Sequence, residues 1–347
     1  MNLATLNINL GSIKKNLNQI QNLSDETVET SAVLKANAYG LGVEPIAIFL
    51  FNEGVRTFFV STVNEAVELS ALLPKNAKIY YLNGYSLNDY QAISEFNIMP
   101  VLNSIEQIAN FTQETDRKQA ALQIDVGMKR LGLNPSELLK AKNICKSIDL
   151  NLILGHLSSA DNESDPVNLQ QLKLFSNLAS FFPNIPKSLA ATGGTVLGKN
   201  YHFDMTRPGI GLFGGNPLKN AEKVVTLSLP VLQIKDIKAN EGVGYNHTFI
   251  SKRKRKIAIV GSGYADGLSR QLSNSGILYA GNVMCPILGR ISMDLITVDI
   301  SNLRENPSFL SALGPSQTID DLAEQSATIG YEILTSLGSR YKRVYNY

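Results

Sequence analysis

Short β-branched runs alternate with stretches of helical period from about residue 12 to residue 215. This alternation is typical of βα units, which build a parallel sheet. We find roughly eight strand signals, and no G-x-G-x-x-G motif follows the first of them. A closed (β/α)8 barrel of the TIM type is therefore favoured over a Rossmann sheet. The signals are TSAVLKA, TFFVST, KIYYLNG, IMPVLN, ALQIDVG, LNLILGHLSS, KSLAATGG and a last short run that ends in RPGIGLFGG.

The pattern changes after about residue 220. Long runs such as VVTLSLPVLQIKDIKA and ISMDLITVDI alternate apolar and polar residues, which is typical of antiparallel β structure. We therefore expect an α/β plus β fold in two domains. Residues 10–222 form the barrel, and residues 223–347 together with residues 1–9 form a mostly antiparallel β domain.

Local signals indicate where some helices begin. Residues 318–338 are expected to form one helix, and Thr318 and Asp321 resemble a capping box with Asp in place of Glu. In the barrel, Asn64 is expected to cap one helix and Pro135 to begin another.

Composition excludes several classes of protein. The 32 Lys and Arg residues nearly balance the 30 Asp and Glu residues, so the net charge of +2 predicts neither a nucleic-acid nor a membrane partner. The 2 cysteines are too few for a disulfide framework, and the 3 histidines do not suit a histidine-rich metal site. Because no apolar run reaches the ~18 residues of a membrane span and no secretory leader is readable, a cytoplasmic protein is expected. The basic run SKRKRK at residues 251–256 is interpreted as a solvated loop.

A lysine ends the first confident strand, in the string AVLKANAYG at residues 32–40. Active sites of barrels lie at the carboxyl ends of their strands. A lysine desolvated at that position has a lowered pKa, so its neutral amine can act as a nucleophile and a base. From the spacing alone, Lys35 would be interpreted instead as a lysine whose stem packs at a strand end while its amine reaches water.

The whole string, followed by Gly42, resembles the pyridoxal-phosphate attachment motif of alanine racemases, and the resemblance covers nearly the whole chain. It implies a pyridoxal-phosphate-dependent isomerase that interconverts L-alanine and D-alanine and so supplies D-alanine for peptidoglycan. The further motifs occur in family order and are INLGSIKKNL, ALQIDVGMKRLG, GHLSSAD, AATGGT, RPGIGLFG, GVGYNHTF, GSGYADG and GRISMD.

The resemblance implies two catalytic residues that act on opposite faces of the substrate. Lys35 would exchange the proton of the D-enantiomer, and Tyr245 that of the L-enantiomer. A phenol is a weak base, so the second role requires neighbouring cations and hydrogen bonds. His156 is the implied tuner and stays neutral because it lies next to Arg207. Without the resemblance, this histidine would be interpreted as a core residue at a strand end.

Arg207 is implied to meet the pyridine nitrogen of the cofactor. A guanidinium cannot accept a proton, so the nitrogen is expected to stay unprotonated, which disfavours side reactions such as transamination. By itself, an arginine before Pro208 is equally consistent with a surface turn. Phosphate binding is expected from backbone N–H groups and hydroxyls. The residues expected to hold the phosphate are Tyr39, Thr192, Gly209 and Ile210.

The implied substrate-binding residues are Arg130, Tyr264 and Met293, and no metal ion is expected. The family resemblance places Tyr245 and Met293 in the active site of the other subunit. A homodimer with shared active sites is therefore expected, because each barrel would otherwise lack its second base.

The chain departs from the family pattern at three places. Gln123 occupies the position where the family often has a carbamylated lysine that supports Arg130. Another acceptor, an anion such as chloride, or the amide oxygen of Gln123 could orient that arginine. Asn246 replaces the glycine after the catalytic tyrosine. The phosphate-binding tyrosine near the C-terminus aligns with Ser339, and Tyr341 lies close to it.

Alternative functions use the same scaffold. A racemase for serine or basic amino acids fits the same motifs, because extra methylenes change binding by only ~1–3 kcal/mol. A decarboxylase of the related barrel fold would lack GYADG and ISMD in this arrangement. A non-catalytic pyridoxal-phosphate carrier would be a barrel without the β domain that holds Tyr245.

Overall fold

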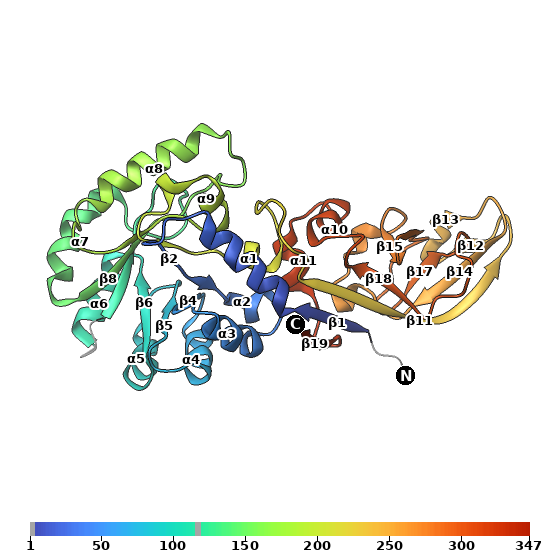
Figure 1. The fold of residues 1–347 in the computed structure, drawn as a ribbon, viewed down its shortest axis with the longest axis horizontal. Coiled ribbons are helices and arrows are strands. Elements are labelled where there is room, and N and C mark those ends of the chain that lie inside the picture. The colour runs from blue at the N-terminus through green and yellow to red at the C-terminus, as the bar shows by residue number, and fades with distance from the viewer. Residues whose placement is uncertain (1–3, 115–118) are drawn as a thin grey trace.

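The structure, a computed structural model, describes residues 4–114 and 119–347, which form two lobes along one long axis (Figure 1). The lobe at the left of Figure 1 holds parallel strands covered by helices, and the lobe at the right holds mostly antiparallel strands. This arrangement confirms the predicted α/β plus β fold. Among the described residues, no helix has the length and hydropathy of a transmembrane span.

The parallel strands of the first lobe close into a barrel. They form the continuous order β3-β4-β5-β6-β7-β8-β9, while β10 pairs in parallel with β2. Backbone hydrogen bonds join β9 to β10, since Asp204 N donates to Lys187 O over 3.0 Å and Arg207 N donates to Ala190 O over 2.8 Å. Only Ser31 separates β2 from β3, so the two form one continuous edge and these bonds close the barrel. The strands are β2 Glu29–Thr30, β3 Ala32–Val33, β4 Thr57–Val60, β5 Lys78–Tyr81, β6 Ile98–Leu102, β7 Gln119–Gln123, β8 Asp149–Leu154, β9 Lys187–Ser188 and β10 Met205–Thr206.

Helices cover the outside of this barrel (Figure 1). Pro135 begins a short 3-10 helix before α7, as predicted. The predicted cap Asn64 is wrong, because Thr62 caps α4 in a capping box with Glu65. The last predicted run contains a 3-10 helix, η5 Ile210–Phe213, because the strand ends earlier at Thr206. The helices are α1 Leu10–Asn22, α2 Lys35–Tyr39, α3 Val43–Asn52, α4 Val63–Leu72, α5 Tyr90–Glu95, α6 Ile105–Glu114, α7 Leu138–Ile144, α8 Pro166–Ala179 and α9 Thr192–Val196.

The second lobe is built on the long strand β11, which pairs with β1, β14 and β18. Its main sheet has the order β16-β15-β18-β11-β1-β19, and β14 pairs with β11 and β17. All these pairs are antiparallel except that of β1 with β19. The strands are β1 Thr5–Asn9, β11 Val225–Ile237, β12 Gly242–Val243, β13 Phe249–Ile250, β14 Arg255–Val260, β15 Ile277–Ala280, β16 Val283–Pro286, β17 Ile296–Asp299, β18 Phe309–Leu313 and β19 Lys342–Asn346.

The single helix expected over residues 318–338 is two helices, α10 Ile319–Gln325 and α11 Gly330–Ser336. Thr318 and Asp321 form the predicted capping box of α10. The helix stops because Ala327 adopts a left-handed conformation with φ of 54°. The break turns α11 toward the barrel, where it contacts α2.

The N-terminal segment joins the two lobes. Thr5–Asn9 pairs with β11 and β19, and Asn9 then caps α1 by accepting a hydrogen bond from Ser12 N over 2.7 Å. Residues 1–3 of the segment assigned to the β domain lie outside the described residues, and the division at residue 222 remains a prediction. One cluster of buried apolar side chains runs through both lobes, including Leu6, Leu34 and Leu334.

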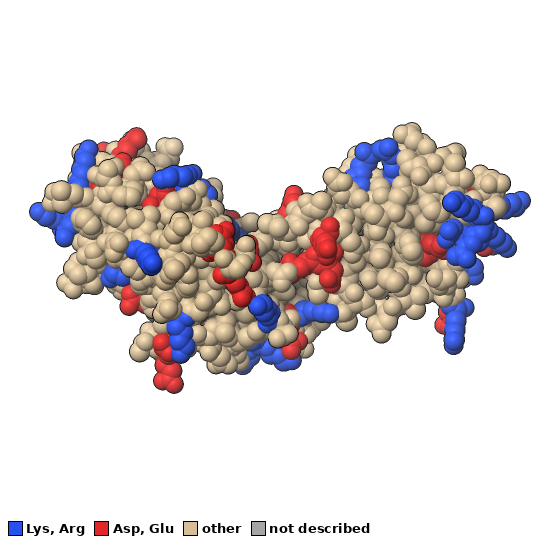
Figure 2. Space-filling view, turned by 90° about the horizontal axis from the view of Figure 1, so that it is seen from above, with Lys and Arg blue, Asp and Glu red and all other residues tan. Residues whose placement is uncertain are grey.

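The surface is hollowed between the lobes, and basic side chains gather at the far end of the β domain (Figure 2). Residues 251–254 of the run SKRKRK lie there between β13 and β14, whereas Arg255 and Lys256 begin β14. Lys252–Lys254 are exposed, in agreement with a solvated loop, whereas Arg255 pairs with Asp299.

Candidate active site

A cavity of 550 Å³ lies at the carboxyl end of the barrel strands and is lined mainly by residues that follow them. Polar groups from strands far apart in the sequence meet there, as the barrel geometry predicts. The predicted residues in its lining are Lys35, Tyr39, Arg130, His156, Thr192, Arg207, Gly209 and Ile210. Among the described residues, no three His, Cys, Asp or Glu side chains are grouped as a metal site would require.

The segment after Lys35 has an unusual backbone. The four residues Ala36–Tyr39 all have positive φ between 51° and 57°, so α2 is a left-handed turn. Left-handed conformations cost L-residues about 1–2 kcal/mol each, so surrounding contacts must fix them. Asn37 Oδ1 accepts from Val43 N over 2.7 Å, and Glu65 Oε1 accepts from Ala36 N over 2.7 Å. The turn brings both Lys35 and Tyr39 into the cavity lining.

The environment of Lys35 favours its neutral amine. Burial lowers the pKa of Lys35, and the positive charge of Arg130 lowers it further, while the carboxylate of Glu65 opposes both effects. A larger fraction of the amine is therefore unprotonated near neutral pH than for a lysine in water, and only that form is a nucleophile.

Arg207 is buried in the cavity lining, and its positive charge acts on the half-buried His156. Arg207 is 5% exposed, and its guanidinium donates to Ser188 Oγ and, over 2.7 Å, to Gly155 O. Burial lowers the pKa of Arg207 to about 10, which still leaves it protonated near neutral pH. Burial and the charges of Arg207 and Arg130 lower the pKa of His156 to about 3. The histidine is therefore neutral under ordinary conditions.

The turn at α9 and the start of η5 form a cradle rich in polar hydrogens. Thr192 Oγ1 accepts from Gly209 N and from Gly211 N, each over 3.2 Å, which leaves its own O–H free to donate. Ile210 N–H begins η5, so this helix provides it with no carbonyl. A Cβ on Gly209 would lie 2.1 Å from Tyr39 Oη, so glycine is required for the tyrosine hydroxyl to reach this backbone.

Gln123 lines the same cavity as Arg130. Its Nε2 donates to Leu131 O over 2.9 Å. Gln123 therefore fixes the backbone next to Arg130, a form of support that was not among the alternatives drawn from the sequence.

Tyr331 lines the cavity from α11 of the β domain, although no sequence motif predicted it there. Its ring lies 6.0 Å from that of Tyr39, centroid to centroid. Tyr341, by contrast, is buried with its hydroxyl 2.8 Å from Ser262 Oγ, and neither it nor Ser339 belongs to the cavity lining. The break between α10 and α11 carries Tyr331 to the site, and no sequence motif indicated that break.

Three predicted residues lie on the β domain, outside the lining of this cavity. Tyr245 is 66% exposed, Tyr264 is 44% exposed and Met293 is 53% exposed. The loops that carry the last two are joined, since Ala265 N donates to Met293 O over 3.0 Å and Arg340 bridges Asp266 and Asp294. A single chain thus exposes these side chains to solvent.

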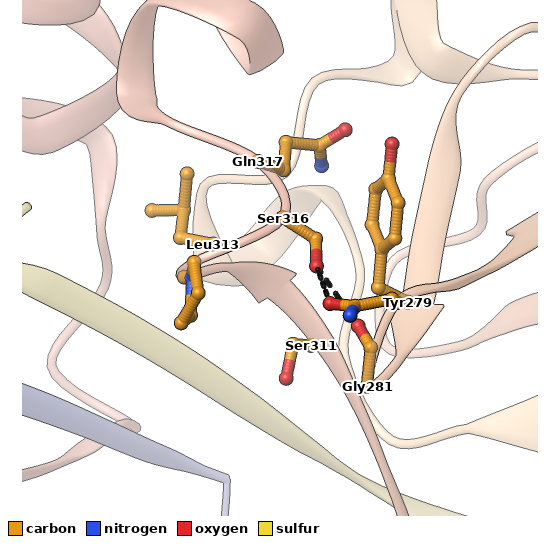
Figure 3. Close-up of a pocket in the computed structure, with 9 residues that line it drawn as sticks. Tyr279, Gly281, Ser311, Leu313, Ser316 and Gln317 are labelled. Carbon is orange, nitrogen blue, oxygen red and sulfur yellow. Dashed lines mark hydrogen bonds between the residues drawn. The ribbon is translucent and has the colours of Figure 1, made fainter.

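Two other cavities lie in the β domain. One of 590 Å³ includes Tyr264 in its lining, beside residues of α11. The other has only 120 Å³ and lies near Tyr279 and Ser316, where the Ser316 hydroxyl donates to Gly281 O and Asn282 Oδ1 (Figure 3). No predicted site residue lines this smaller cavity.

Comparison with known proteins covers both lobes. Residues 8–217 match the family described as "Alanine racemase, N-terminal domain", and residues 224–345 match "Alanine racemase, C-terminal domain". The chain belongs to the alanine racemase family. An alanine racemase from Cereibacter sphaeroides is 44% identical over 342 residues, which cover 99% of this chain and 98% of that protein. An alanine racemase from Rickettsia akari is 41% identical and covers 99% of both chains.

Solved structures of the alanine racemase family share the whole architecture. Alanine racemase from Bartonella henselae with covalently bound pyridoxal phosphate has a TM-score of 0.94 and 38% identity, with 100% of both chains covered. The biosynthetic alanine racemase from Pseudomonas aeruginosa has a TM-score of 0.94 at 27% identity, again with 100% of both chains covered. The family predicted from the motifs is confirmed.

Proposed function

We propose that this chain is an alanine racemase that interconverts L-alanine and D-alanine with pyridoxal phosphate and supplies D-alanine for peptidoglycan. The observation that carries the proposal is the meeting of Lys35, the pair of His156 and Arg207, and the cradle at Thr192 in one cavity. Identity of 44% over almost the full length of an alanine racemase supports the same substrate.

The residues present fit pyridoxal phosphate. The cavity volume of 550 Å³ lies within the ~300–1,000 Å³ of small-molecule sites. Lys35 supplies the amine for covalent attachment, and the hydroxyls of Tyr39 and Thr192 with the Ile210 N–H would hold the phosphate. The missing Cβ of Gly209 leaves the space that the Tyr39 hydroxyl uses. When bound, the cofactor withdraws electrons from the α-carbon of the amino acid and makes its C–H bond more acidic.

Arg207 and His156 would control protons around the ring. Arg207 would face the ring nitrogen, where its guanidinium donates but does not accept a proton. His156 with its pKa of about 3 cannot provide a second positive charge there near neutral pH. With the cofactor bound, both features would keep that nitrogen unprotonated, which would favour racemisation over transamination.

Racemisation needs one proton acceptor on each face of the α-carbon. Lys35 Nζ would hold the proton on one face, and Tyr245 Oη would hold it on the other. Arg130 would bind the substrate, together with Tyr264 and Met293. Since Tyr245 and Met293 are exposed on the β domain, we assign them to the active site of a second copy of the chain, and the enzyme is a homodimer.

The proposed compartment is the cytoplasm. Cys145 and Cys285 are both buried and free, which suits a reducing environment.

Sedimentation at micromolar concentration tests the dimer, since an active monomer would contradict the shared site.

Chiral product analysis tests the reaction. L-alanine, L-serine and L-lysine are each incubated with the protein and pyridoxal phosphate, and the D-enantiomer is measured. We expect conversion of alanine and its loss in Lys35→Ala. Faster conversion of serine or lysine would show a different racemase on the same scaffold, and release of carbon dioxide would show a decarboxylase. A protein that develops no visible absorbance from lysine-bound cofactor would overturn the assignment.

A further inference from the structure

Glu65 makes contacts that its place in α4 alone does not require. Its Oε2 accepts from Ser61 N over 2.7 Å and from Thr62 N over 3.1 Å. Its Oε1 accepts from Ala36 N over 2.7 Å. A capping glutamate ordinarily satisfies the first turn of its own helix. This carboxylate additionally reaches Ala36, the residue next to Lys35, in the turn that follows the neighbouring strand β3.

The contact falls where the backbone leaves β3 and becomes left-handed. Ala36 has φ of 53° and ψ of 48°, and its N–H is the first of the left-handed turn. Such a turn persists only when its surroundings fix it. Glu65 lies on α4, whose start follows β4, and β4 pairs directly with β3. The carboxylate therefore ties the lysine-bearing turn to the rigid end of the adjacent strand.

We propose that Glu65 is a positioning residue that holds the turn after Lys35 and so sets where the lysine amine meets the cofactor. The inference rests on the proposed function, because it takes Lys35 as the attachment residue. Glu65 does not line the cavity, whereas Lys35 and Ser61 do, so Glu65 acts through the backbone and not on the substrate.

Only a carboxylate can serve both sides of this contact. All three hydrogen bonds that the Glu65 carboxylate accepts are donated by backbone amides. A glutamine has one oxygen acceptor and one nitrogen donor, so its nitrogen would face an N–H on one side. Glu65→Gln therefore keeps the shape of the side chain but breaks the link to Ala36 or the link to Ser61 and Thr62.

The negative charge provides a second readout. The carboxylate of Glu65 raises the pKa of Lys35, against burial and the charge of Arg130, which lower it. Removing that charge lowers the pKa of the lysine further. The pH midpoint at which the lysine amine becomes reactive should then move to lower pH.

The test measures bond formation between Lys35 Nζ and the aldehyde carbon of pyridoxal phosphate, which releases one water. Protein freed of cofactor by dialysis is mixed with pyridoxal phosphate, and the visible absorbance is followed at several pH values. For Glu65→Gln we expect bond formation about ten-fold slower than in the parent, a pH midpoint shifted downward and faster hydrogen exchange at Ala36 N–H. In the reloaded enzyme, kcat should fall while KM for alanine changes less than about two-fold.

Two variants of the same helix are the controls. Thr62→Ala removes the hydroxyl that caps Glu65 N over 3.3 Å but keeps the carboxylate, so it lowers the melting temperature without moving the pH midpoint. Glu68→Gln removes an exposed charge one turn along.

The outcomes separate two failures. A parent protein that forms no lysine bond overturns the proposed function and this inference with it. A parent that forms the bond, with Glu65→Gln matching its rate and pH midpoint, overturns the positioning role alone. An equal loss of rate in Thr62→Ala also overturns it, because the effect would then come from the stability of α4.

Discussion

Gly209 is where a single added carbon should affect cofactor binding most directly. A Cβ there would lie 2.1 Å from Tyr39 Oη and 2.9 Å from Cζ, which forces the phenol ring to move. Overpacking of this kind costs about 1–3 kcal/mol. We expect Gly209→Ala to weaken pyridoxal-phosphate binding about ten-fold, the equivalent of ~1.4 kcal/mol, as measured by absorbance titration.

A double-mutant cycle controls for general damage. Tyr39→Phe removes the hydroxyl oxygen, which is the atom closest to the added Cβ. The loss of unfolding free energy caused by Gly209→Ala should therefore be smaller in the Tyr39→Phe background. Equal losses in both backgrounds would mean that the tyrosine is not what the alanine displaces.

His156 should make the stability of the fold depend on pH. Its pKa is lowered from 6.5 to about 3 by burial first and then by the charges of Arg207 and Arg130. Between these pH values the unfolded chain binds a proton that the folded chain does not, so the free energy of unfolding falls as pH falls. The loss of unfolding free energy begins below pH 6.5 and reaches about 2 kcal/mol at pH 5.

The matching variant is His156→Gln, which cannot titrate. Guanidinium unfolding at pH 7.5 and at pH 5 should show a drop in stability smaller by about 2 kcal/mol than in the parent. If both proteins lose the same stability over this range, the histidine titrates normally in the folded chain.

Motif residues could be predicted because each motif is local. Lys35, His156 and Arg207 end or follow barrel strands, and a strand end fixes their direction toward one face. Tyr331 could not be predicted, because it reaches the cavity from the other lobe through the packing of α11 on α2. Long-range packing of this kind leaves no periodic signal in the chain.

At the level of elements, the alternation of βα units predicted the order of the barrel strands. It did not predict the left-handed backbone of α2. The string KANAY contains no glycine at the four left-handed positions, so ordinary turn chemistry predicts nothing there. The conformation is imposed from outside by Glu65 and by Arg343, whose guanidinium donates to Gly40 O over 2.8 Å. Residues distant in sequence therefore decide this local structure.

Ala36 offers a direct test of that strain, because its side chain is exposed and its φ is 53°. A β-branched side chain is least tolerated at positive φ. We expect Ala36→Val to lower the free energy of unfolding by about 1–2 kcal/mol. Ala36→Gly, the matched variant, should leave it unchanged or raise it by less than about 1 kcal/mol, since relief of strain offsets the entropy of glycine. Equal effects of both variants in denaturant unfolding would contradict a strained turn.

At the level of the whole molecule, hydrogen bonds join the two lobes next to the active-site turn. Arg343 of β19 donates to Gly40 O and, over 3.0 Å, to Leu337 O, and Tyr345 donates to Leu41 O over 2.7 Å. The turn after Lys35 is thus part of the junction between the lobes. Two domains were readable from the change in pattern, whereas their relative placement depends on these contacts, which no local pattern encodes.

Tyr245 is 66% exposed in a single chain, so its proposed role requires that it enter the active site of a second copy. Lys35→Ala and Tyr245→Phe chains should each form nearly inactive dimers. When the two are refolded together in equal amounts, half of the dimers are mixed, and each mixed dimer joins one intact Lys35 to the intact Tyr245 of its partner. Activity should therefore return to about a quarter of that of the parent. If both residues acted within one chain, every site in the mixture would lack one of them and no activity would return, so this single measurement decides between a shared and a self-contained site.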